Sequence, residues 1–174
     1  DLTLDMLSLV EAQPDLNDLL VVVLDRRATA LSGLEKHEQA LPLAKRAWAL
    51  YEQAPGQHKS IEPYQLHYSV GNAQYFLGQL EAAEKSLYAA LQSLDNSSPG
   101  ELSRSTRVRV TQLLGSVYRR LGQPQLALEQ ILLSHQMVVE NNGPDHPEFF
   151  RSLLSLGLAH WTAGNHGEAL SLNR

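Results

Sequence analysis

Four segments of this chain repeat one pattern of small residues at nearly constant spacing, and this periodicity constrains the fold most. An alanine stands at the same place in residues 26–47, 70–91, 114–135 and 156–172. Successive alanines are 43, 44 and 42 residues apart, and they are Ala40, Ala83, Ala127 and Ala169. A fixed period of this length indicates a repeat architecture in which each unit is one supersecondary motif.

Two glycines accompany the alanine in three of the four segments, one twelve residues and one five residues before it. In a helical hairpin the first glycine lets two helix backbones approach closely. The second ends the first helix, because glycine tolerates the left-handed conformation of a helix end. Another small residue follows the alanine by seven positions, on the same helix face. These residues are Gly71, Gly115 and Gly157, then Gly78, Gly122 and Gly164, and then Ala47, Ala90 and Ser134.

The combination of small residue, turn glycine and alanines resembles the tetratricopeptide repeat, and the resemblance covers most of the chain. The spacing of 42–44 residues is similar to that of kinesin light chain and related bacterial proteins, as is the connector at 141–160. The resemblance implies an all-α fold, a right-handed α-solenoid of antiparallel helical hairpins. The predicted parts are the end of a preceding helix at 1–13 and repeats at 14–54, 61–96, 101–140 and 147–174, the last one truncated.

The first repeat departs most from the pattern. Glu35 stands where the turn glycine should be, and Pro42 falls inside the expected second helix. A proline in a helix interior costs about 3 kcal/mol, so this helix is expected to start late or to kink.

The connector at 141–160 contains residues that are typical of helix ends and helix starts. Asn142 and Gly143 are expected to end one helix, and Pro147 suits the first turn of the next. Asp145 is the predicted N-cap. Because neither end of the chain shows an obvious cap and no starting Met is present, the parent protein is expected to be longer.

Composition narrows the function classes. The longest apolar run, Leu19 to Leu24, is too short for the roughly 18 residues that a membrane span needs, so no membrane insertion is expected. The absence of cysteine excludes disulfides and thiolate sites, and the net charge of −5 argues against nucleic acid. Residues 1–38 carry −5 and residues 100–122 carry +4. This asymmetry either steers a partner or reflects solvated helix faces.

No catalytic, metal or cofactor motif emerges, so the chain is not expected to be an enzyme and no cofactor is predicted. No phosphate loop or nucleophile elbow is present. Four of the seven histidines fall at repeat positions where the resemblance implies packing between helices: His37, His67, His160 and His166. The sequon at Asn96 is interpreted as a polar turn.

The resemblance implies that the first helices of the hairpins line a concave binding groove, with ligand-facing residues at fixed offsets. In the second repeat these offsets fall on Gln65, Tyr68, Asn72, Tyr75 and Phe76, and in the third on Arg109, Gln112, Ser116, Arg119 and Arg120. Asparagine can hydrogen-bond a peptide backbone and arginine pairs with carboxylate. The carboxylate-clamp variant is rejected, since its matching positions hold Asp25, Tyr68 and Leu113.

The leading hypothesis is a protein-interaction module, part of a larger regulatory or signalling protein, that binds an extended acidic peptide. A cytoplasmic location is favoured. Two alternatives stay open at this point: a structural spacer that self-associates through its ends, and a sensor of a small molecule or signalling peptide.

Overall fold

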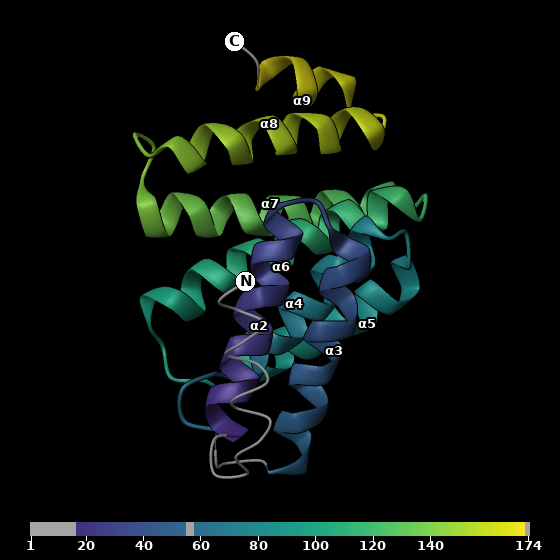
Figure 1. The fold of residues 1–174 in the computed structure, drawn as a ribbon. Helices are drawn as coiled ribbons and strands as arrows, with labels where there is room; N and C mark the ends of the chain where they lie inside the picture. The colour runs from purple at the N-terminus through teal and green to yellow at the C-terminus, as the bar shows by residue number, and fades with distance from the viewer. Residues whose placement is uncertain (1–16, 55–57, 173–174) are drawn as a thin grey trace. The chain divides into compact units, whose positions relative to one another are not determined.

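The computed structural model describes residues 17–54 and 58–172, and within them every regular element is an α-helix (Figure 1). The all-α class and the hairpin repeat are therefore confirmed. The predicted helix end at 1–13 lies outside the described residues. The chain divides into two compact units, residues 1–97 and 98–174. The helices are α2 (Asn17–Gly33), α3 (His37–Gln53), α4 (Pro63–Phe76), α5 (Leu80–Asp95), α6 (Glu101–Arg120), α7 (Pro124–Asn142), α8 (Pro147–Thr162) and α9 (His166–Ser171).

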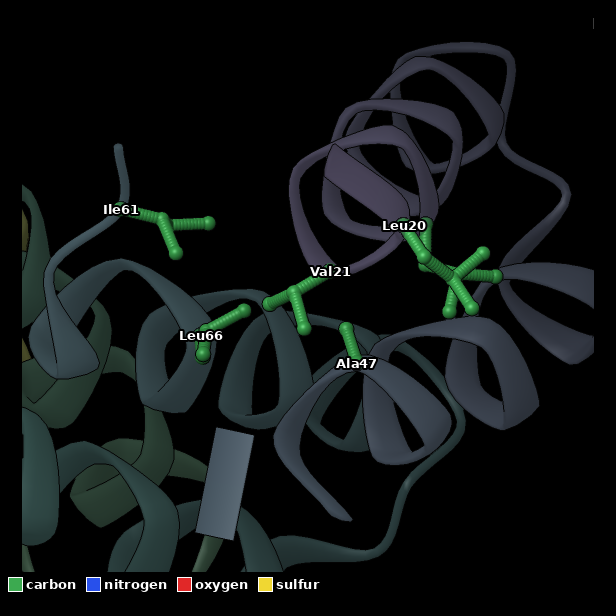
Figure 2. Packing of buried hydrophobic residues seen from close by; sticks show 6 residues of the cluster. Leu20, Val21, Ala47, Ile61 and Leu66 are labelled. Atoms are coloured by element: carbon green, nitrogen blue, oxygen red, sulfur yellow. The ribbon is translucent and has the colours of Figure 1, made fainter. Parts of the chain in front are cut away.

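The first unit contains two hairpins, α2–α3 and α4–α5, and α4 packs against both helices of the first hairpin. Figure 2 shows Val21 of α2 directed toward Leu66 of α4, with Ala47 of α3 beside them. All three are fully buried. The small Ala47 side chain leaves room for the bulkier neighbours, so the three helices share one apolar core.

The second unit repeats the arrangement with α6–α7 and α8–α9, and α7 packs against both α6 and α8 (Figure 1). Ile131 of α7 forms a buried cluster with Leu156 and Ala159 of α8. The central helix α7 therefore fixes α6 and α8 within one unit.

The glycines of the first helices stand where helices approach closely, as the sequence predicted. A Cβ added to Gly71 would lie 2.9 Å from Cγ of Leu87, and one added to Gly115 would lie 2.6 Å from Cγ1 of Ile131. The alanines at the start of the second helices are equally enclosed, because Ala40, Ala83, Ala127 and Ala169 are all buried.

The turn glycines also behave as predicted. Gly78 has a φ of 75° and Gly122 a φ of 72°, both in the left-handed region that follows a helix end. Each turn is closed by a backbone hydrogen bond typical of a glycine cap, such as Gln79 N–H to the carbonyl of Gln74 at 2.9 Å. In the first repeat Glu35 adopts the same conformation with a φ of 59°. The turn is thus preserved without the glycine.

The structure contradicts two local expectations, the late start of the first repeat's second helix and the N-cap of α8, whereas the alternative of a kink at Pro42 stays a prediction. Helix α3 does not start late, since it begins at His37, before Pro42. Tertiary burial of Ala40, Leu41 and Ala44 holds this turn in place despite the proline. At α8 the N-cap is His146, not Asp145, because the Nδ1 atom of His146 accepts a hydrogen bond from Glu148 N–H at 3.2 Å. Asn142, Gly143 and Pro147 occupy their predicted places at the helix ends.

Candidate functional site

The predicted residues of the second repeat lie along α4, in the first unit. Tyr68, Asn72 and Tyr75 are half-buried, and Phe76 is exposed at the end of the helix. The Phe76 ring stacks on His37 with centroids 4.3 Å apart, and Tyr75 meets it edge-on at 5.1 Å. These ring contacts hold the aromatic side chains at the end of α4 against α3.

The predicted residues of the third repeat lie along α6, in the second unit. Arg109, Arg119 and Arg120 are exposed, while Gln112 and Ser116 are half-buried. The Ser116 hydroxyl donates to the carbonyl of Gln112 at 3.2 Å, one helical turn earlier. The α4 residues and the α6 residues belong to different units, so their use by one ligand stays a prediction.

Helix α8 carries the positions that correspond to those of α6 one repeat later in the sequence. A shift of 42 residues along the repeat places Arg109, Gln112, Ser116 and Arg119 onto Arg151, Leu154, Leu158 and Trp161. All four α8 residues are exposed. We call the eight residues of these two sets, together with Arg120, the α6–α8 face. The repeat spacing alone could have identified its second half.

The α6–α8 face has one sign of charge. Of its nine positions four are arginine, at 109, 119, 120 and 151, and none is Asp or Glu. Three more are large and apolar, at 154, 158 and 161. Arginine presents a planar fork of hydrogen-bond donors that matches the two oxygens of a carboxylate.

On α2, the position that corresponds to Tyr68 of α4 holds Asp25, whose side chain is not exposed on the surface. Asp25 is buried, and it accepts a hydrogen bond from the Ser69 hydroxyl of α4 at 2.6 Å. Burial raises the pKa of the Asp25 carboxyl, while the Ser69 hydrogen bond and the nearby charge of Arg26 lower it to a smaller extent. This carboxyl therefore links two first helices inside the unit instead of facing outward.

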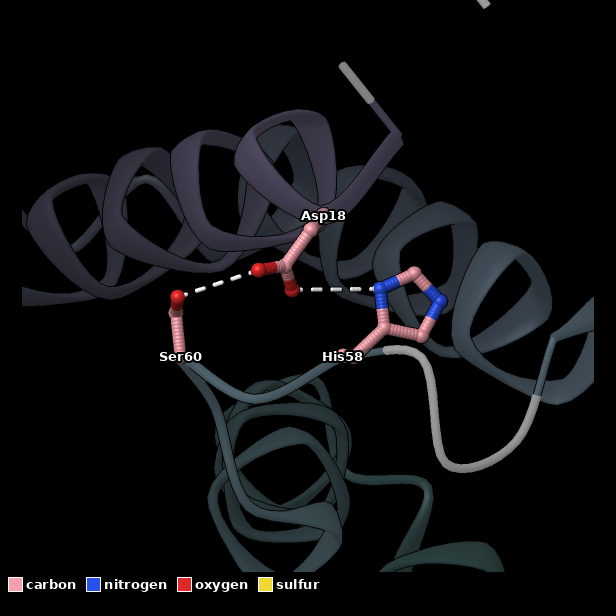
Figure 3. Close-up of polar contacts among 3 residues, drawn as sticks. All are labelled: Asp18, His58 and Ser60. Carbon is pink, nitrogen blue, oxygen red and sulfur yellow. Dashed lines mark hydrogen bonds and ion pairs between the residues drawn. The ribbon is translucent and has the colours of Figure 1, made fainter. Parts of the chain in front are cut away.

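A second polar link ties the connector before α4 to the start of α2 (Figure 3). The Nδ1 atom of His58 lies 3.3 Å from a carboxylate oxygen of Asp18, and the Ser60 hydroxyl donates to the other oxygen at 3.0 Å. His58 is buried, with its ring 5.1 Å from that of Tyr51. His58 lies in the connector between α3 and α4, where no helical spacing predicts that a side chain is buried.

The other histidines serve packing and capping. His67 lies 3.9 Å from Trp48 between ring centroids, and His166 lies 4.5 Å from Trp161. Burial lowers the pKa of His67. Across residues 17–54 and 58–172 no group of three His, Cys, Asp or Glu side chains could hold a metal ion. None of the described helices is long and apolar enough to cross a membrane.

Comparison with protein families identifies the repeat. Residues 104–174 match the family model of the tetratricopeptide repeat. The chain matches this repeat model over α7, α8, α9 and most of α6. Its resemblance to this repeat, including the kinesin light chain variety, is thereby confirmed, and no curated protein matches the chain.

Solved tetratricopeptide structures share the fold at low sequence identity. YrrB, described as a TPR protein with an unusual peptide-binding site, is 22% identical with a TM-score of 0.58, and the match covers 87% of this chain and 64% of YrrB. This chain thus spans less than two thirds of YrrB.

A putative kinesin light chain from Podosopora anserina, with nearly identical TPR-like repeats, is 17% identical with a TM-score of 0.67. That match covers 98% of this chain and 83% of the other. The Rap conjugation gene regulator of plasmid pLS20, solved with the Phr* peptide, is 17% identical with a TM-score of 0.67, over 90% and 40% of the two chains. These likenesses establish the solenoid fold class of antiparallel hairpins.

Proposed function

We propose that this chain is a protein-interaction module that binds an extended, acidic peptide through the α6–α8 face. The observation that carries the proposal is the composition of that face, four arginines and three large apolar side chains without a carboxylate. Arg109, Arg119 and Arg151 are exposed on helices of one compact unit. We propose no catalytic role for any residue.

The chemistry of each residue type defines its role in this proposal. The arginines pair with carboxylates of the peptide, in the bidentate geometry that guanidinium groups favour. Gln112 offers both a donor and an acceptor to the peptide backbone. Tyr68, Asn72 and Tyr75 are proposed as a further set of peptide contacts on α4 of the first unit. Tyrosine supplies contact area at low entropic cost, and asparagine can bond both backbone groups.

Two related structures support a peptide as the ligand class. YrrB is described by its peptide-binding site, and the Rap regulator was solved with a bound peptide. Stacked helical hairpins present extended surfaces of this kind to their ligands. An extended peptide suits them, because its side chains can meet successive repeats.

The proposal is tested by reversing two charges on the face. The probe is a synthetic peptide with four Asp or Glu residues beside two Leu residues, compared with a counterpart carrying Asn and Gln instead. The acidic peptide should bind the natural chain more tightly than its neutral counterpart. The double variant Arg119→Glu/Arg120→Glu should bind the acidic peptide at least about tenfold more weakly, because hydrogen bonds between charged groups are worth about 1.5–3 kcal/mol.

A matched control separates the face from the overall charge. The double variant Lys45→Glu/Arg104→Glu makes the same change in net charge at two exposed positions outside the face. It should retain most of the affinity at physiological salt, where charges further apart than about 8 Å are screened. Equal losses in both double variants, or no binding of the acidic peptide, would contradict the proposal.

A further inference from the structure

A row of large apolar side chains lies exposed along α8. Leu154, Leu158 and Trp161 have exposed fractions of 67%, 51% and 55%. Their spacing of four and three residues places them on one side of the helix. We call these three residues the α8 stripe. Contiguous exposed apolar patches mark interaction sites, whereas single exposed apolar residues are ordinary.

The α8 stripe opens into a cavity of about 250 Å³ at the junction of α8 and α9. Leu158, Trp161 and Leu170 form its walls, while Gly157 and Ala169 complete the lining. Glycine and alanine at these two positions leave the space that a larger side chain would fill. The cavity can therefore accept an apolar side chain from outside.

The Trp161 ring is held beside this cavity by a neighbour. It lies 4.5 Å from the His166 ring of α9, tilted by 56°. A tryptophan with a restricted position loses little entropy when a partner packs on it, and tryptophan is enriched among residues that dominate binding energy. Trp161 is thus the strongest candidate anchor point of the stripe.

Positive charge lies next to this apolar surface. Arg151 precedes Leu154 by three residues on the same side of α8 and is exposed. Arg119, at the position of α6 that corresponds to Trp161, is exposed as well. An apolar surface beside exposed arginines complements a ligand in which bulky apolar side chains stand close to carboxylates.

We infer that the partner of this module is an amphipathic acidic peptide whose bulky apolar residues, of the Leu or Phe type, pack on the α8 stripe. One such side chain enters the cavity between Leu158, Trp161 and Leu170. Carboxylates of the same peptide meet Arg151 and the arginines of α6. This inference rests on the proposed function and adds the second half of the recognition chemistry. Apolar burial supplies affinity, while the arginines set orientation and exclude neutral partners.

The cavity can be observed directly through Trp161. The chain has two tryptophans, and Trp48 lies in the first unit. In a Trp48→Phe background, Trp161 is the only tryptophan fluorophore. Titration with the acidic peptide that carries two Leu residues should shift the Trp161 emission to shorter wavelength. A counterpart with the two Leu residues replaced by Ser should bind at least about tenfold more weakly, since burying one Leu side chain is worth about 1.5–3 kcal/mol.

The stripe is tested in the same background by Leu154→Ser/Leu158→Ser. Both positions are exposed, so the fold should tolerate the change, which circular dichroism would verify. The double variant should lose about tenfold in affinity for the leucine-containing peptide and discriminate poorly against the serine counterpart. The matched control is Leu126→Ser/Leu133→Ser on α7, two apolar residues of similar exposure outside the stripe. It should bind as the parent does.

Three results would overturn the inference, and they separate it from the proposed function. If the stripe variant binds like its control while Arg119→Glu/Arg120→Glu loses binding, the arginine site stands and the apolar site is wrong. If no peptide binds to any form, both fail. If Trp161 emission shifts with protein concentration alone, and sedimentation shows association that the stripe variant abolishes, the stripe is covered by a second copy of the chain.

Discussion

At the scale of single residues, the fold depends on the absence of side-chain volume at a few positions. Gly71 and Gly115 leave the space into which Leu87 and Ile131 pack. The buried alanines at the start of the second helices do the same from the opposite side. Because protein interiors are close-packed, added volume at such sites must displace a neighbouring helix.

The substitution Ala83→Leu tests this directly. Ala83 is fully buried, so the larger side chain should lower the free energy of unfolding by about 1–3 kcal/mol or more. Ala49→Leu in α3, where Ala49 is exposed, is the matched control and should change stability by less than about 0.5 kcal/mol. Urea denaturation of both variants is the measurement. Equal effects would show that the helix crossing is not tightly packed at Ala83.

Asp25 introduces a pH dependence at the residue scale. Burial raises the pKa of its carboxyl in the folded chain above the ordinary value of 3.8, so folding favours the neutral form. The free energy of unfolding therefore falls as pH rises from that ordinary value through the raised one. Asp25→Asn removes this contribution. The stability of Asp25→Asn relative to the natural chain should increase with pH across that window and then level off.

Denaturation at a series of pH values measures this difference. The readout is how this stability difference changes with pH, and not its absolute size. The absolute size also reflects the buried Asn amide, which would need hydrogen-bond partners of its own. Asp145→Asn, at an exposed connector residue, is the control and should track the natural chain at every pH. If the difference in free energy of unfolding between Asp25→Asn and the natural chain is the same at every pH in the window, the Asp25 carboxyl titrates alike in the folded and the unfolded chain.

At the scale of the element, each hairpin depends on a left-handed residue between its two helices. Gly78, Gly122 and Gly164 supply it in three hairpins, and Glu35 supplies it in the first. A residue with a side chain pays roughly 1–2 kcal/mol for this conformation. The first turn nevertheless forms, with Lys36 N–H donating to the carbonyl of Leu31 at 2.9 Å.

Glu35→Gly should therefore stabilise the chain, by up to about 1 kcal/mol once the greater flexibility of glycine in the unfolded state is subtracted. The reverse change, Gly122→Ala, should destabilise it by a similar amount, since no neighbouring atom crowds that position and only the backbone conformation opposes a side chain. Thermal melts of the two variants would check the opposite signs. Destabilisation by Glu35→Gly would mean that the Glu35 side chain makes a contact worth more than the strain.

At the scale of the whole molecule, the chain is a series of hairpins whose contacts are mostly with sequence neighbours. The described residues form two compact units, one containing α2 to α5 and the other α6 to α9. In repeat proteins stability is approximately a sum of repeat and nearest-neighbour terms. A destabilising substitution in one hairpin should therefore lower stability mainly within its own unit.

Hydrogen exchange followed by mass spectrometry can test this. Leu66 of α4 and Leu114 of α6 are both fully buried, and replacing either with alanine should cost about 2–5 kcal/mol. Leu66→Ala should lower amide protection chiefly in α2 to α5, and Leu114→Ala chiefly in α6 to α9. Equal loss throughout the chain in both variants would instead indicate a single cooperative unit.

The sequence by itself determined the all-α class, the hairpin period and the packing roles of the small residues. These follow from local rules, because glycine and alanine positions reflect backbone conformation and close approach at a fixed helical spacing. Through its resemblance to the family, the sequence also placed Tyr68 and Arg119 on the first helices of their hairpins, which are α4 and α6.

Only the tertiary structure decided which contacts override local preference. Pro42 sits inside α3 because buried neighbours hold the helix, and His58 is buried because Asp18, forty residues earlier, binds its ring. The exposure of Leu158 and Trp161 beside a cavity is likewise a property of the assembled hairpins. Each of these three features depends on residues that are distant in sequence or on the side-chain volumes around a space. None of them is encoded in a local sequence pattern.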